Sequence, residues 1–177
     1  MILTGEKIIE EVKEGNIVID PFTIDQITTN SYDLTLGNTF IKYTSETLDP
    51  KIDNPYELLE IEENMAIKMN KGDFILGSSK ERIGSTKYVP IIHSKSSIAR
   101  LWLFVHITAD LIDIGSIGTT TFQLYATLPI TLYPWMLIGQ VTFWKTFGEI
   151  KLYEGKYQHS NGPVSSKSFI DYRKENE

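Results

Sequence analysis

The chain has 177 residues, of which 41% are hydrophobic and 23% are charged, a composition typical of one globular domain. It contains no cysteine, which excludes a disulfide scaffold, a thiol nucleophile, an iron–sulfur cluster and the cysteine-held zinc of one class of nucleobase deaminases. The formal net charge of -6 argues against a large basic surface, so we expect no nucleic-acid partner.

The beginning of the chain is acidic and lacks a basic segment followed by an apolar run, so the sequence predicts no signal peptide. The longest apolar-leaning stretch, residues 130–144, is interrupted by Pro134, Gly139 and Gln140 and is too short and too polar to span a bilayer. We therefore expect a cytoplasmic protein with no membrane partner.

Predicted secondary structure begins with a short helix that Thr4 caps and Gly15 ends. The helical period then disappears, and residues 17–19 predict the first strand. The other predicted strands are Tyr32 to Phe40, Met65 to Met69, Asp73 to Leu76, Tyr88 to Ile92, Leu101 to Thr108, Gly118 to Thr127, Ile130 to Leu132 and Gln140 to Phe147. Turn signals such as Gly77-Ser78 separate them, and residues 44–63 predict an acidic loop that leads into a further strand. This pattern predicts a mostly β sandwich or barrel.

The domain organisation expected from the sequence is a single β domain, residues 1–152, followed by a C-terminal tail or lid, residues 153–177. The polar composition of residues 154–168 favours a disordered tail. The aromatic residues Tyr153, Tyr157 and Phe169, in and beside this segment, leave open a tail that becomes ordered on another surface.

Three segments contain candidate functional residues. Residues 94–100 combine two cations with three hydroxyls, a set that suits phosphate oxygens but also suits a solvated turn. Asp113, followed by Gly115 and Gly118, is placed either to orient a water molecule or to form a plain turn. In the tail, Tyr153 and Lys156 would supply stacking and a phosphate contact if the tail closes as a lid.

Other common signatures are missing from the sequence. The three histidines have no metal-ligand spacing, so we interpret them as structural or surface residues. Neither G-x-G-x-x-G nor G-x-x-x-x-G-K-[ST] occurs, so any nucleotide would be bound by another architecture.

Taken in order and at their spacing, several motifs resemble the dCTP deaminase branch of the trimeric dUTPase-like superfamily. Residues 30–38 (NSYDLTLGN) resemble its early S-x-D-L-x-L-G strand, and residues 95–101 (KSSIARL) resemble R-S-S-L-A-R-L. Residues 105–118 (VHITADLIDIGSIG) resemble V-H-V-T-A-x-x-I-D-P-G-x-x-G. Residues 134–140 (PWMLIGQ) resemble the later P-G-M-x-I-x-Q turn, and residues 156–163 resemble the C-terminal lid.

This resemblance implies a distorted jelly roll with a short N-terminal helix, and a homotrimer whose sites lie between subunits under C-terminal lids. It also implies a pyrimidine deoxynucleoside triphosphate, dUTP or dCTP, with Mg²⁺ bound mainly through the triphosphate and no metal ligand from the protein. The implied substrate-binding residues are Lys95, Ser96, Ser97, Arg100, Thr108, Ala109, Asp113, Gln123, Tyr153, Lys156 and Ser160. Arg100, Asp113 and Gln123 occupy the catalytic positions, with Asp113 placed to act on water.

Gln123 departs from the family pattern T-L-E-L, in which the glutamate transfers the proton during deamination. An amide cannot accept and return a proton near neutral pH, so efficient deamination is not expected. The Gln123 side chain can either donate to O4 of uracil or accept from the amino group of cytosine. Pyrophosphate release needs a carboxylate to orient water, cations and Mg²⁺, all of which stay available.

The sequence therefore favours a dUTP diphosphatase that forms dUMP and pyrophosphate. One alternative is a dCTP deaminase, or a bifunctional deaminase and dUTPase, in which a neighbouring group replaces the lost glutamate. A second alternative is a catalytically silent trimer that binds nucleotide as a sensor.

Overall fold

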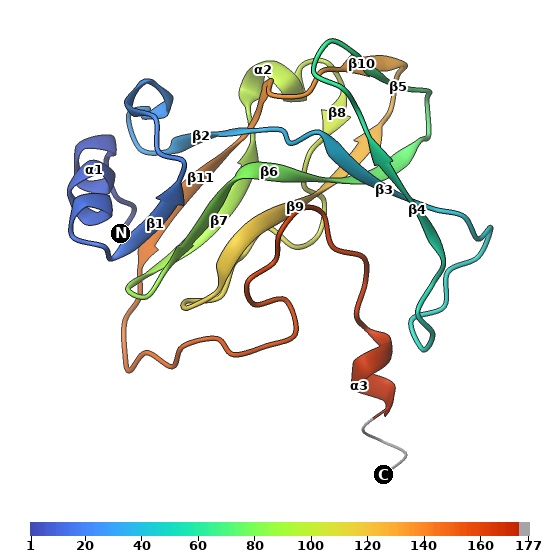
Figure 1. Cartoon of the computed structure of the whole chain (residues 1–177). Coiled ribbons are helices and arrows are strands. Elements are labelled where there is room, and N and C mark those ends of the chain that lie inside the picture. Colours follow the sequence, from blue (N-terminus) through green and yellow to red (C-terminus); the bar gives the residue numbers. More distant parts are fainter. Residues whose placement is uncertain (174–177) are drawn as a thin grey trace.

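Burial alternates along the strands, because successive side chains of a strand point to opposite faces of a sheet. On β9 (Ile117–Ala126), Phe122 and Leu124 are buried, whereas Thr121 and Gln123 are only partly covered. The computed structural model describes residues 1–173, in which the strands surround one apolar core and helix α1 (Gly5–Lys13) lies at one end (Figure 1). The mostly β class predicted from the sequence is confirmed.

The remaining elements are β1 (Ile17–Asp20), η1 (Ile24–Gln26), β2 (Tyr32–Thr35), β3 (Thr39–Tyr43), β4 (Tyr56–Glu60), β5 (Ile67–Met69), β6 (Phe74–Ser85), β7 (Tyr88–Ser94), α2 (Ser96–Ala99), β8 (Leu103–Phe104), β10 (Ile130–Leu132), β11 (Leu137–Lys145) and α3 (Phe169–Arg173). In residues 1–173 these strands form three antiparallel sheets. The largest has the order β4-β3-β6-β9-β8, with β1 also paired to β6; the others are β2-β11-β7 and β10-β5.

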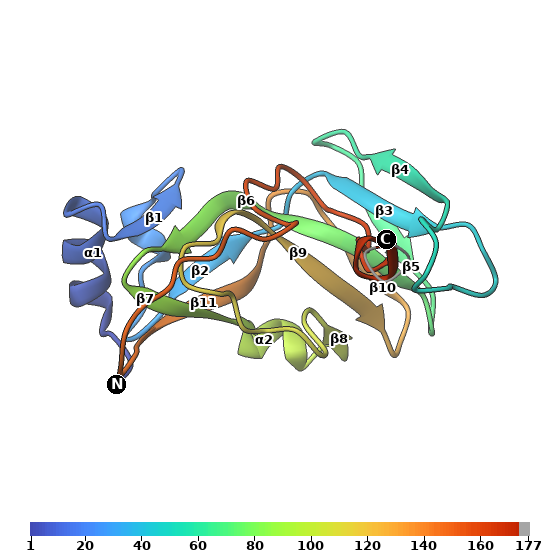
Figure 2. The same ribbon diagram turned by 90° about the horizontal axis from the view of Figure 1, so that it is seen from below.

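The core lies between the two larger sheets (Figure 2). Tyr32 and Phe143 come from the three-stranded sheet, Phe40 and Phe122 come from the largest sheet, and all four side chains are fully buried. The buried side chains of both sheets form one continuous cluster. Burial of this apolar surface is the main source of stability of such a fold.

Most predicted strands are present, with shifted ends. Residues 130–132 form β10 as predicted, whereas the predicted strand 32–40 is divided into β2 and β3 around Gly37, whose N–H donates to the Ser78 carbonyl (2.8 Å). The predicted strand 101–108 is wrong, since only residues 103–104 form a strand. Trp102 has a φ of 61°, a left-handed conformation that interrupts an extended chain at this point.

The turn predicted at Gly77-Ser78 is also wrong, because both residues lie inside β6. A Cβ atom on Gly77 would lie 3.2 Å from side-chain atoms of Leu36, Phe40 and Leu124. Gly77 is therefore required for close packing of the core rather than for a change in chain direction.

Helix α1 begins as predicted, because the Lys7 N–H donates to the Thr4 side chain (3.4 Å). On its inner face Glu11 is buried, and its carboxylate forms ion pairs with Lys7 (2.9 Å) and Lys87 (3.1 Å). Burial by itself raises the pKa of Glu11, but hydrogen bonds from Lys7, Lys87 and Asn16 outweigh it and lower the pKa to about 2. None of the helices within residues 1–173 is long and apolar enough to cross a membrane.

We expect Glu11→Gln to lower the free energy of unfolding by about 1–2 kcal/mol at pH 7, a modest loss because both lysines are half-exposed. Because the pKa of Glu11 is lowered on folding, its contribution is present above pH 4.5 and is lost as the pH falls toward 2. The difference in the free energy of unfolding between variant and wild type, measured by urea unfolding, should therefore become smaller as the pH is lowered. The control Glu10→Gln removes an exposed partner of the same Lys7 and should change little; equal effects of the two substitutions would contradict this account.

Candidate active site

A cavity of about 490 Å³ lies beside β9, and this volume suits a small organic ligand. Its walls come from β9, from the loop that follows β8 and from the C-terminal tail. They include Thr121, Gln123, His106, Ala109, Tyr157 and Ser160. The cavity therefore joins segments that are far apart in the sequence.

Gln123 is held in a defined orientation in this cavity. Its backbone N–H donates to the Val105 carbonyl (3.0 Å), and its side-chain Oε1 accepts the N–H groups of Ile107 and Thr108 (3.3 Å each). Because Oε1 faces these two donors, the Nε2 amide group is left to face away from them and makes no hydrogen bond within residues 1–173. The structure thus presents Gln123 to a ligand as a hydrogen-bond donor.

His106 lies in the same wall of the cavity. Its Nε2 contacts the Ala109 carbonyl, while Nδ1 is buried and has no hydrogen-bond partner among the described residues. Burial lowers the pKa of His106 below its usual value, opposed by the Ala109 carbonyl, by the charge of Asp110 and by the nearby Val105 carbonyl. The imidazole is therefore neutral at pH 7, with Nε2 as the donor and Nδ1 as the acceptor.

Part of the C-terminal tail lines the cavity, including Tyr157, Ser160 and Val164. This part of the tail passes beside β9 (Figures 1 and 2). The Thr119 N–H donates to the Ser160 carbonyl (2.9 Å), and the His159 N–H donates to the Ile117 carbonyl (3.1 Å). The Gln158 side chain accepts the Ile117 N–H (2.8 Å) and donates to the Gly115 carbonyl (2.7 Å).

This tail is ordered on its own chain, unlike the disordered tail that composition favours. Its hydrogen bonds to β9 replace those that a solvated tail would make with water. Residues 174–177 of the predicted tail lie outside the described residues.

Residues 2–146 match the family model described as dCTP deaminase-like. The chain belongs to the dCTP deaminase-like family. A relative named "dCTP deaminase, dUMP-forming", from Clostridium botulinum strain Eklund 17B, is 41% identical over 98% of this chain and 100% of the relative. Relatives of the same name from Clostridium beijerinckii and Cytophaga hutchinsonii are 37% and 36% identical, with the same coverage.

The fold of this dCTP deaminase-like chain is also found in a solved structure. The crystal structure of the 2′-deoxycytidine 5′-triphosphate deaminase from Agrobacterium tumefaciens gives a TM-score of 0.63 at 18% identity. The match covers 80% of this chain and 47% of that chain. At this identity the similarity shows a shared fold, while the family model and the full-length relatives confirm the resemblance seen in the sequence motifs.

These relatives overturn the prediction of a dUTP diphosphatase without deamination. The relatives that match over their full length are named as dUMP-forming dCTP deaminases and not as diphosphatases, and the chain is an enzyme of the dCTP deaminase-like family. The prediction gave one departure, Gln123, more weight than the similarity over the whole chain.

The structure brings together only some of the predicted site residues of this family member. Ala109, Gln123 and Ser160 line the cavity, and Thr108 adjoins it through its backbone bond to Gln123. The Ser160 hydroxyl donates to the Thr119 carbonyl (2.7 Å).

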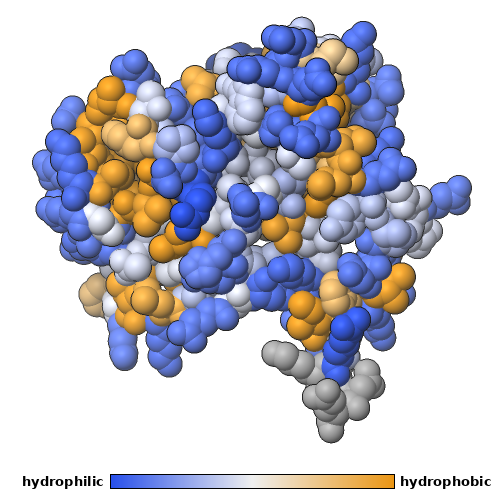
Figure 3. Space-filling view, in the orientation of Figure 1, coloured by the Kyte–Doolittle hydropathy of each residue, from blue (hydrophilic) through white to orange (hydrophobic). Residues whose placement is uncertain are grey.

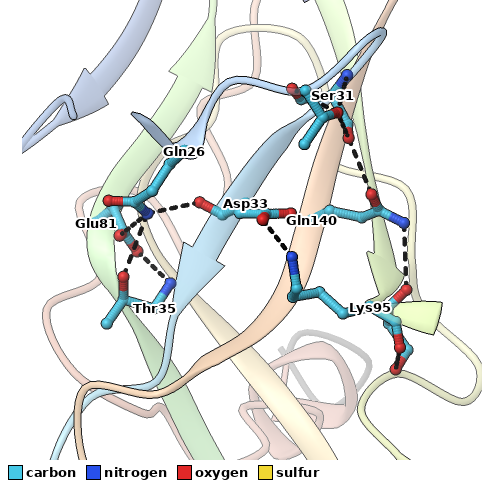
Figure 4. A network of polar contacts seen from close by, with 9 residues as sticks. Gln26, Ser31, Asp33, Thr35, Glu81, Lys95 and Gln140 are labelled. Atoms are coloured by element: carbon cyan, nitrogen blue, oxygen red, sulfur yellow. Dashed lines mark hydrogen bonds and ion pairs between the residues drawn. The ribbon is translucent and has the colours of Figure 1, made fainter. Parts of the chain in front are cut away.

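The predicted phosphate-binding residues lie elsewhere on the same chain. Lys95 forms an ion pair with Asp33 of β2, within a polar network between β2, β7 and β11 (Figure 4). Ser96 and Ser97 begin α2 and are exposed, and the exposed Arg100 that follows donates to the Ser96 carbonyl (2.8 Å).

Three further predicted residues also lie away from the cavity. Asp113 and Tyr153 line a second, more open groove of about 350 Å³. Lys156 forms an ion pair with Asp171 of α3. Within one copy of the chain, the predicted site residues are therefore divided between the cavity and other surfaces.

One residue that lines the cavity is absent from the predicted site. His106 is interpreted from the sequence as a structural or surface residue, although it stands inside the motif VHITA, which was the available signal. Gln158 belongs to the tail segment that resembles the lid, but its contacts with Gly115 and Ile117 are long-range and have no signal in the local sequence.

Within residues 1–173 no group of three or more His, Asp or Glu side chains is close enough together to hold a metal ion. The cavity itself presents amide, hydroxyl and imidazole groups rather than the carboxylates that Mg²⁺ prefers, so these residues do not make a magnesium site.

Proposed function

We propose that this chain converts dCTP and two water molecules into dUMP, ammonia and pyrophosphate. The observation that carries this proposal is similarity over the full chain to relatives named "dCTP deaminase, dUMP-forming". The cavity supports it, because its volume suits a nucleoside and its polar groups lie on one wall. The position of a family glutamate is held by Gln123 in that wall.

The division of the predicted residues supports a site completed by a second copy of the chain. In the proposed homotrimer, the Lys95, Ser96, Ser97 and Arg100 segment of one subunit would contact the phosphates of a nucleotide held in its neighbour's cavity. Asp113 and Tyr153 would be presented to the same ligand from the second groove, and Lys156 from the tail.

Exposed apolar surface favours such an assembly. Leu101, Trp102, Phe104 and Ile107, all close to this segment, are between 46% and 62% exposed. Figure 3 shows further apolar patches on one face of the molecule. Surface of this kind is typical of interfaces between subunits. Light scattering after size-exclusion chromatography measures the mass of the assembly.

Mg²⁺ belongs to this proposal as an ion carried by the triphosphate. Bound there, it would neutralise phosphate charge and stabilise the leaving pyrophosphate. This suits an acidic protein, because a net charge of -6 gives the chain few cations to spare for a triphosphate.

The test supplies purified protein and Mg²⁺ with dCTP, and measures ammonia, pyrophosphate and dUMP in parallel. We expect the three products in equal amounts, with dUTP as a parallel substrate that yields only dUMP and pyrophosphate. The absence of ammonia from dCTP would contradict the proposal. Nucleotide binding without any product would instead identify a silent binding protein.

A further inference from the structure

The proposed deamination needs a group that takes a proton from water and later delivers it to the leaving amine. Gln123 cannot do this, because an amide does not titrate near neutral pH and its Oε1 is occupied by two backbone N–H groups. The titratable side chains that line the cavity within residues 1–173 are Tyr43, His106 and Tyr157.

Two of these three side chains are already engaged. The Tyr43 hydroxyl accepts the Ser166 N–H (2.8 Å), and the Tyr157 hydroxyl accepts the Lys167 N–H (2.9 Å). Both tyrosines also need strongly basic conditions to ionise. His106 remains, and its buried Nδ1 is without a partner among the described residues.

Hydrogen bonds from the backbone fix the position of His106 relative to Gln123. Val105 and Ile107, the two neighbours of His106, are both hydrogen-bonded to Gln123. The contact from His106 Nε2 to the Ala109 carbonyl fixes the tautomer in which Nδ1 carries the lone pair.

The charged groups that act on His106 are Asp110, which favours its protonation, and His93, which opposes it. Burial has a larger effect than either and keeps the ring neutral, as a proton acceptor must be.

We propose that His106 is the proton-transferring catalytic residue of deamination in this chain, with Gln123 as its hydrogen-bond-donating partner. A water O–H bond breaks as the C4–O bond forms, and His106 Nδ1 takes this proton and passes it to N3, which leaves a hydroxyl on C4. Gln123 Nε2 donates to the oxygen bound at C4. His106 then takes the proton of the C4 hydroxyl and delivers it to the exocyclic amine, the C4–N bond breaks, ammonia leaves and the C4 carbonyl forms. Water thus supplies the carbonyl oxygen and both transferred protons.

This inference rests on the proposed function, so the test compares two products. His106→Asn should lower ammonia release from dCTP on the order of 10²–10⁴-fold. Pyrophosphate release from supplied dUTP should fall far less, so the ratio of the two activities is the readout. The matched control His93→Asn changes a histidine that pairs with Thr142 (3.0 Å) and does not line the cavity, and it should preserve the ratio.

Two further measurements separate a catalytic role from a structural one. In the wild type, kcat/KM for ammonia release should fall at acidic pH as His106 becomes protonated, and His106→Asn should lose this dependence. The double variant His106→Asn with Gln123→Glu should regain ammonia release, because the new carboxylate can carry the proton.

The outcomes are distinguishable. A wild type without ammonia release overturns the proposed function and this inference together. A deaminating wild type whose His106→Asn variant keeps its ammonia release, or loses both activities equally without rescue in the double variant, overturns the inference alone.

Discussion

Gln123→Glu is expected to raise ammonia release from dCTP by about 10²-fold, the lower end of the contribution of a placed general acid or base. The substitution keeps the side-chain length, so one carboxylate oxygen still accepts the N–H groups of Ile107 and Thr108. The second oxygen replaces the Nε2 group. A group that only donates a hydrogen bond thereby becomes one that can accept a proton and return it. Release of ammonia from dCTP at saturating nucleotide measures the change.

The control for this experiment is Gln123→Met, which has a similar length but neither donates nor accepts strongly. We expect it to lower ammonia release below that of the wild type, since the oxygen at C4 loses its donor. If Gln123→Glu leaves ammonia release unchanged, residue 123 is not the position that limits proton transfer.

Truncation after Leu152 is the second change with a large expected effect. It removes Tyr157, Ser160 and the rest of the tail wall of the cavity, so water enters and ligand positioning is lost. We expect turnover of dCTP to fall by at least about 10²-fold, the loss that follows even small misplacement of reacting groups. The body of the fold should survive, because the continuous core cluster lies within residues 8–143.

A point variant of the full chain provides a check on the truncation. A Cβ atom on Gly118 would lie 2.4 Å from Ser160 Oγ and 2.7 Å from Ser160 N, so Gly118→Ala must displace the tail from β9. It should lower turnover in the same direction and increase proteolysis of the tail. Normal turnover in both variants, with an unchanged thermal transition, would contradict a role for the tail.

The chain has an amide at position 123, where the family pattern has a glutamate. The relatives named as dUMP-forming deaminases match this chain from end to end, and a single amide at position 123 does not outweigh that similarity. The role proposed for His106 corresponds to the alternative in which a neighbouring group replaces the glutamate, since hydrogen bonds link the residues on both sides of His106 to Gln123.

Local features of the sequence determined the fold class and the position of most strands. The alternation of side chains along β9 places Phe122 and Leu124 in the core. Thr4 begins helix α1 by accepting a hydrogen bond from the N–H of Lys7, three residues further along the chain. Such signals act between close neighbours, so they are visible in the sequence. The motifs at residues 95–101 and 105–118 similarly indicated the family before any contact was known.

Only the tertiary structure decided which of these residues meet. Lys95 is paired with Asp33, 62 residues away, and Ser160 packs on Gly118 of β9, so neither contact can be inferred from local pattern. The same applies to the orientation of Gln123, which is set by two backbone N–H groups from a loop that the sequence predicted as a strand. Hydrogen bonds between distant segments depend on how the sheets pack, and for that reason the donor at Gln123 and the unpartnered nitrogen of His106 emerged only from the folded chain.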